Sequence, residues 1–65
     1  MNIQLGKKYR ERFNNLEFEV LEQRVAQDKK FGDVMLWKVG YTKDHKYYTE
    51  WHTNTFLENL QIEEL

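Results

Sequence analysis

Large apolar side chains recur at every second position between Val34 and Tyr41, and this alternation constrains the fold more than any other feature of the sequence. Met35, Trp37, Val39 and Tyr41 would share one face of a strand, because successive side chains of a strand point to opposite faces. Residues of these β-branched and aromatic types are also common in strands. The sequence therefore predicts a central β-strand here.

A hairpin is predicted from the residues that follow this strand. Residues 42–46 contain no apolar residue and predict a turn, and residues 47–52 are again rich in strand-forming types. Period-two alternation divides this second strand into two faces, with Tyr47, Thr49 and Trp51 on one and Tyr48, Glu50 and His52 on the other. We expect the second of these faces to point outward.

Residues 16–27 allow two interpretations. Leu16, Phe18 and Val20 alternate with glutamates, which favours a half-buried strand. The alternation then slips by one residue at Leu21, as it does at a β-bulge. The alternative is a helix over residues 16–27 in an α+β fold, since the same stretch is rich in helix-forming residues. The strand is the favoured interpretation.

Shorter signals lie near both ends of the chain. Tyr9 follows a turn glycine, Gly6, and is the expected inward anchor of a first short strand. The run 56–60 suits a single 3₁₀ turn, and residues 60–63 suit a last strand. The prediction is thus an all-β fold of five short strands, with a 3₁₀ turn before the last.

One domain covering residues 1–65 is expected, because the chain is too short for two cores. Ten aromatic residues provide the apolar area that so small a core needs. Cysteine is absent, which excludes disulfides and is typical of proteins of the reducing cytoplasm. No stretch has the apolar length of a signal peptide or a membrane span, so a cytoplasmic location without membrane association is expected.

Five loose motifs run through nearly the whole chain: Leu5-Gly6-x-x-Tyr9, Phe18-x-Val20-Leu21, Trp37-x-Val39-x-Tyr41, Tyr48-x-x-Trp51 and Phe56-x-x-x-Leu60-x-Ile62. Together they resemble the small Src-homology-3-like barrels, which include the Tudor and KOW groups, of short bacteriophage and bacterial accessory proteins. The resemblance implies a five-stranded small barrel that serves as a binding module, since such barrels bind proteins, peptides or nucleic acids far more often than they catalyse. The Ala-Leu-Tyr pattern of the proline-binding members is absent, so proline-rich ligands are not implied.

The two ends of the chain differ in charge, although the net charge is only −1. Residues 50–65 contain glutamates but no lysine or arginine, whereas the start of the chain carries Lys7, Lys8, Arg10 and Arg12. We expect the two terminal strands to lie side by side and neutralise each other. The alternative is that this basic strip binds nucleic acid, with aromatic side chains stacking on the bases.

The sequence contains few residues suited to catalysis. Serine and cysteine are both absent, and the two histidines, His45 and His52, are expected to be surface residues. No spacing typical of a metal site links them to Asp44, and the glycines are isolated rather than gathered in a phosphate-binding loop. We therefore expect a protein that is not an enzyme and that uses no metal and no cofactor.

Protein binding is the favoured function. A short sheet leaves edge strands and surplus aromatic residues exposed to a partner. Tyrosine is frequent at binding hot spots, and the residues expected to touch the partner are Tyr48, Glu50 and His52 on the outward face of the hairpin. Self-association is one form of such binding.

Overall fold

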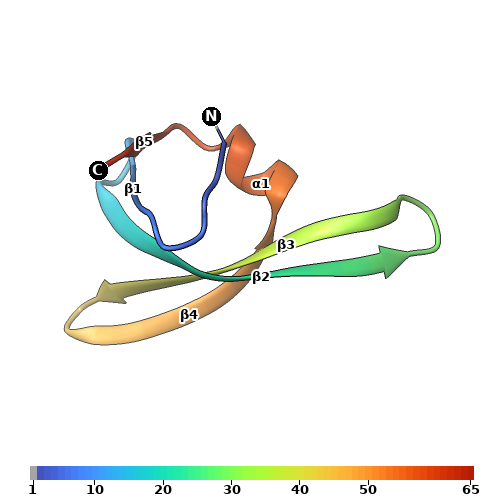
Figure 1. Ribbon diagram of the computed structural model, residues 1–65. Helices are drawn as coiled ribbons and strands as arrows, with labels where there is room; N and C mark the ends of the chain where they lie inside the picture. Colours follow the sequence, from blue (N-terminus) through green and yellow to red (C-terminus); the bar gives the residue numbers. More distant parts are fainter. Residues whose placement is uncertain (1) are drawn as a thin grey trace.

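Two long strands, β2 (Leu16–Asp28) and β3 (Gly32–Lys43), form the centre of the computed structural model, which describes residues 2–65 (Figure 1). The shorter strands are β1 (Lys8–Glu11), β4 (Lys46–Thr53) and β5 (Ile62–Glu64), and one helix, α1 (Asn54–Asn59), precedes β5. The prediction of five strands in a mostly β fold is confirmed.

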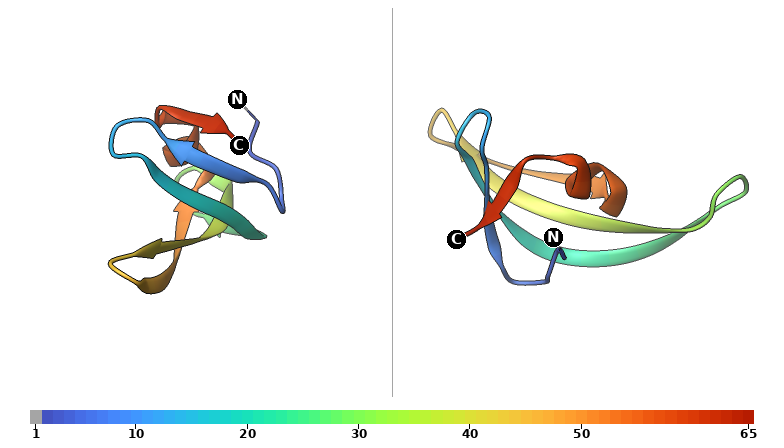
Figure 2. Two further views of the ribbon diagram at one scale, coloured as in Figure 1. Left: turned by 90° about the vertical axis from the view of Figure 1, so that its left-hand side faces the viewer. Right: turned by 90° about the horizontal axis from the view of Figure 1, so that it is seen from above.

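All five strands belong to one antiparallel sheet, in the order β4-β3-β2-β1-β5. The last strand therefore returns to pair with the first, and β4 and β5 form the two edges of the sheet. Within residues 2–65 no pairing joins these edges, so the sheet is curved but open (Figure 2). Closure into a barrel is not confirmed.

β2 is a strand along its whole length, so the alternative of a helix over residues 16–27 is wrong. Phe18 and Val20 are buried on the face that packs into the core. The register against β3 shifts between Val20 and Glu22, which confirms the expected bulge. Pairing with β3 and the burial of these side chains override the helix propensity of the residues that follow.

The hairpin turns are set by residues with left-handed backbone angles or by side-chain caps. Between β3 and β4 the loop is only Asp44 and His45, whose φ angles of 52° and 65° suit a type I′ turn. In the β2–β3 loop, Asp28 Oδ1 accepts hydrogen bonds from two backbone amides, those of Lys30 and Phe31. These short connections hold β2, β3 and β4 as consecutive antiparallel neighbours.

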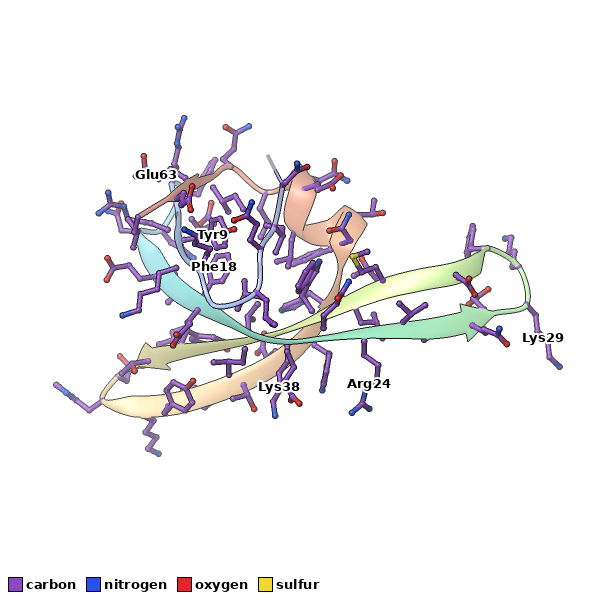
Figure 3. All side chains as sticks on the ribbon, viewed as in Figure 1. Tyr9, Phe18, Arg24, Lys29, Lys38 and Glu63 are labelled. Carbon is purple, nitrogen blue, oxygen red and sulfur yellow. The ribbon has the colours of Figure 1, made fainter. Side chains whose placement is uncertain are left out.

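The core lies on one face of the curved sheet, which we call the core face; the opposite face is the outer face. The most buried core residues are Tyr9, Val20 and Leu57, and the others are Ile3, Phe18, Trp37, Val39 and Ile62. The rings of Tyr9 and Phe18 stack with centroids 5.7 Å apart (Figure 3). The Tyr9 hydroxyl accepts a hydrogen bond from the Gln4 amide, at 2.9 Å. Tyr9 is thus the inward anchor that the sequence predicts.

A short α-helix, α1, stands where a single 3₁₀ turn was expected, so that detail of the prediction is wrong. The Thr53 hydroxyl caps its first turn by accepting a hydrogen bond from the Phe56 amide, at 3.1 Å. Leu57 is buried in the core, and Trp37 Nε1 donates to Asn54 Oδ1. These contacts stabilise a helix too short to persist alone. No helix within residues 2–65 has the length and apolar character needed to cross a membrane.

β2 and β3 extend beyond the strands beside them. β1 pairs with β2 only from Leu16 to Glu19, and β4 pairs with β3 only from Leu36 onward. Residues 25–35 therefore form a two-stranded arm that projects from the rest of the molecule (Figures 1 and 2).

Candidate protein-binding groove

A groove of about 250 Å³ opens on the core face between β4, α1 and the start of β2. Its lining is mainly apolar and aromatic and consists of Leu16, Phe18, Val39, Tyr41, Phe56, Leu57 and Leu60, with Glu11, Asn14, Glu50 and His52 as its polar members. No lysine or arginine is among these residues. The groove is thus an apolar site with carboxylates near it.

The register of the β3–β4 hairpin brings two of the three expected partner-binding residues into this groove. Glu50 lies opposite Val39 and His52 lies opposite Trp37, and directly opposed residues of a sheet share a face. Tyr48 lies on the same face, opposite Tyr41. Their grouping on one face of β4 is confirmed.

The expectation that this face points outward is wrong. Tyr48, Glu50 and His52 lie on the core face, and the outer face of β4 carries the alternate residues. The physical reason is the length of the turn. Two turn residues place Tyr48, Glu50 and His52 directly opposite the β3 residues that face the core. The side chains remain accessible because β4 is an edge strand that extends past the core.

Three side chains form a hydrogen-bonded row along the groove. The Tyr41 hydroxyl donates to Glu50 Oε1 at 2.7 Å, and His52 Nε2 lies 3.0 Å from Glu50 Oε2. The hydrogen bond from Tyr41, and then the contact with His52, hold the pKa of Glu50 below its ordinary value of 4.5. The same hydrogen bond raises the pKa of Tyr41. Glu50 is therefore a fixed, ionised acceptor at neutral pH.

Aromatic rings flank this row on both sides. Tyr48 stacks on Tyr41 with centroids 5.6 Å apart, and Phe56 stacks on the His52 ring at 4.6 Å. Tyr48 and Phe56 are 41% and 47% exposed, so each presents a large apolar surface to solvent while its orientation is fixed by a neighbour. Rigid, partly exposed aromatic rings are the side chains that most often dominate binding energy at protein interfaces.

The opposite wall of the groove is the β1–β2 turn. Both carboxylate oxygens of Glu11 accept backbone amides of this turn, from Phe13 at 2.8 Å and from Asn14 at 3.0 Å. The Asn14 side chain in turn accepts the Leu16 amide at 3.1 Å. These bonds fix the wall in place, so the groove has a defined width without any partner present.

The sequence does not identify Tyr41, Phe56 and Leu60 as groove residues. The size of Tyr41 and Phe56 predicts a core position for both, and the position of Leu60 predicts that it begins the last strand. Tyr41 and Leu60 do pack against the core cluster, but both also line the groove. Only the docking of α1 beside β4 brings all three together.

The basic strip lies along β1, beside β5. Arg10 contacts Glu63 at 2.9 Å and Arg12 contacts the same carboxylate at 3.9 Å, while Lys7 contacts Glu64 at 3.5 Å. The expectation that the terminal strands lie side by side and neutralise each other is confirmed. Within residues 2–65 only Lys8 of this strip has no carboxylate within ion-pair distance.

No group of three or more histidine, aspartate or glutamate side chains suited to a metal ion is found in the described part of the chain. No family model matches this sequence, and the searches of curated proteins and of solved structures likewise find nothing similar to it.

Proposed function

We propose that this protein is a small, non-enzymatic binding module that recognises another protein through the groove beside β4. The observation that carries the proposal is an apolar groove whose polar groups, Glu50 and His52, are already held by hydrogen bonds. Two exposed aromatic rings, Phe56 and Tyr48, stack on residues that line it. Such a combination of apolar floor and few oriented polar groups is typical of recognition sites.

The edge position of β4 adds a second means of attachment. Within residues 2–65 no strand pairs with its free side, so its backbone groups can bond to a partner segment. A segment that pairs with β4 would place alternate side chains over Tyr48, Glu50 and His52. Main-chain bonds would supply affinity, and the groove would supply selectivity.

The proposal includes an architecture and a setting. We regard the open sheet as a variant of the Src-homology-3-like small barrel, in a cytoplasmic accessory protein of phage or bacterial type. The strand order, in which the last strand returns to the first after a helical turn, supports the architecture. The setting rests on the sequence resemblance alone.

Adjacent tyrosines of β4 provide a matched test. Tyr48→Ala removes the exposed ring that stacks on Tyr41 of the groove, whereas Tyr47→Ala changes the outer face of the same strand, where Tyr47 is 61% exposed. We expect affinity purification from the native host, followed by mass spectrometry, to recover a protein with the wild type and with Y47A but not with Y48A. Recovery of the same protein by all three, or of none by the wild type, would contradict the proposal.

Nucleic-acid binding is the alternative outcome, and the ion pairs of β1 count against it because they occupy Lys7, Arg10 and Arg12. A phosphate-binding strip would shift a labelled oligonucleotide at about 50 mM salt and lose affinity steeply as salt rises. Replacing the four basic residues with glutamine would abolish that shift. A shift with these two properties, together with unchanged behaviour of Y48A, would replace the groove proposal.

A further inference from the structure

A long edge of β2 has no neighbouring strand, from Glu22 to the end of the strand in the arm formed by residues 25–35. The pairing of β2 with the N-terminal part of the chain ends at Val20, whose backbone bonds to Gly6 and Lys7. From Glu22 to Asp28, β2 pairs only with β3, and its other edge is free among residues 2–65. An isolated two-stranded ribbon is marginal in water, and a free edge is a template for another strand.

Several of the features that usually prevent pairing are absent from this edge, although three of its seven residues, Glu22, Arg24 and Asp28, are charged. Between Glu22 and Asp28 there is no proline, no lysine and no glycine, and the strand is regular after the bulge. Val25 is 57% exposed on the core face of the arm, next to Met35 across the ribbon. The arm therefore presents both unpaired backbone and uncovered apolar surface.

We propose that two copies of the chain pair with each other along Arg24–Asp28 of this edge, antiparallel and about a twofold axis, so that one sheet continues through both molecules. A symmetric pairing of this kind must be self-complementary in charge. Among the registers that pair at least five residues of this edge in each copy, the sequence allows that in only one.

The favoured register is centred on Ala26. It places Arg24 of each copy opposite Asp28 of the other, which gives two opposite-charge pairs on the outer face. Centring the pairing on Val25 instead would place Glu22 opposite Asp28, and centring it on Arg24 would place two guanidinium groups opposite each other. Like charges directly opposed across strands are destabilising, so both shifts are disfavoured.

Arg24 and Asp28 each have a contact within one copy that bears on these pairs. The Arg24 guanidinium lies over the Trp51 ring, 5.0 Å from its centroid, on the side of the sheet away from α1 (Figure 3). Asp28 uses Oδ1 for the turn amides, and within residues 2–65 its Oδ2 accepts no hydrogen bond. Asp28 can therefore accept Arg24 of a second copy through Oδ2 while it keeps the turn amides, whereas Arg24 exchanges its contact with Trp51 on β4 for that carboxylate.

The same register joins the exposed apolar surfaces of the two arms. Val25 would lie opposite Gln27 of the second copy and diagonal to the second Val25, within reach across the axis. At the axis itself the small side chain of Ala26 lets the two backbones approach. Pairing thus covers apolar surface that a single copy leaves in water, at a site separate from the groove.

Charge reversal provides the first test. Arg24→Glu creates two repulsive pairs in the homodimer, and so does Asp28→Lys. In a mixture of the two variants, the new glutamate of one copy faces the new lysine of the other, and one wild-type pair of Arg24 with Asp28 is kept. We expect sedimentation equilibrium to show that the wild type is a dimer. Each variant alone should lose about tenfold or more of its affinity for itself, and the equimolar mixture should recover dimer affinity. Lys43→Glu, a charge reversal at the other hairpin tip, should have no effect.

Disulfide trapping tests the register with the wild-type charges in place. The chain has no cysteine, so Ala26→Cys adds a single thiol, which would lie at the axis within disulfide distance of its copy. We expect A26C to crosslink readily on mild oxidation and Val25→Cys to crosslink poorly. A strict monomer at high concentration, a dimer unaffected by both charge reversals, or preferential crosslinking of V25C would each overturn the proposal.

Discussion

Tyr41 shows how one residue serves both the core and the groove. Its ring packs against the core cluster, and its hydroxyl reaches Glu50 on the neighbouring strand. The aromatic ring could be placed in a strand from sequence alternation, but its hydroxyl partner could not. That partner depends on the register of β3 against β4.

Removing the Tyr41 hydroxyl should change the titration of Glu50. With Tyr41→Phe we expect the pKa of Glu50 to rise toward 4.5, because the largest cause of its depression is lost while the His52 contact remains. A depressed folded pKa contributes stability above the ordinary value and loses it as pH falls through the depressed value. The variant should lose that contribution.

Carboxyl carbon NMR of labelled protein across pH 2 to 7, a range of roughly two units or more on each side of an ordinary glutamate pKa, measures this directly. Tyr48→Phe is the matched control, since Tyr48 stacks on Tyr41 and makes no side-chain hydrogen bond to Glu50. An unchanged Glu50 midpoint in Y41F would show that the hydroxyl does not set the pKa.

Tyr47 and Tyr48 illustrate what alternation predicts and what it leaves open. Their assignment to opposite faces follows from period two alone and is correct. Which face is buried depends on the turn length, and Asp44 and His45 form a shorter turn than the polar stretch 42–46 suggests. Had the turn been assigned to Asp44 and His45 alone, counting along the two strands would have predicted the pairing of Tyr48 with Tyr41.

At the scale of elements, α1 positions one side of the groove. Its cap at Thr53 and the bond from Trp37 to Asn54 fix where the helix begins, and Phe56 and Leu57 then point to the groove and the core. The sequence predicts only a turn here because the run 56–60 is too short for a stable helix. The contacts with β3 and β4 are what stabilise it.

The cap should be measurable by a matched pair of threonine substitutions. Thr53→Ala removes the acceptor of the Phe56 amide and should destabilise the fold by about 1 kcal/mol. Thr55→Ala makes the same chemical change inside the helix, where alanine is favoured, and should be neutral or slightly stabilising. Urea unfolding followed by circular dichroism compares the two; equal losses would show that the cap contributes nothing specific.

At the scale of the whole molecule, stability depends on one small core that includes residues from nearly every element. Leu57 is 2% exposed and connects α1 to the sheet, whereas Phe56 beside it is half-exposed. Leu57→Ala should cost about 2–5 kcal/mol, which is a large share of the stability of so short a chain.

Thermal unfolding provides the measurement. A lowering of about 4–8 °C for each kcal/mol is expected for a domain of this size, so L57A should melt far below the wild type. Phe56→Ala, the control, should melt within a few degrees of it while still losing the partner of the groove. A small change in L57A would mean that α1 is not part of the cooperative core.

The sequence by itself determined the local features: the strands, the bulge in β2, the inward position of Tyr9 and the attraction between the basic and acidic ends. Each follows from side-chain period, turn chemistry or charge, which act between near neighbours or between whole segments. Tertiary structure decided the open sheet, the helical form of α1, the side of β4 that meets the groove and the free edge of the arm. These depend on where strands of unequal length stop pairing and on what covers the sheet, and alternation along one strand carries no information about either.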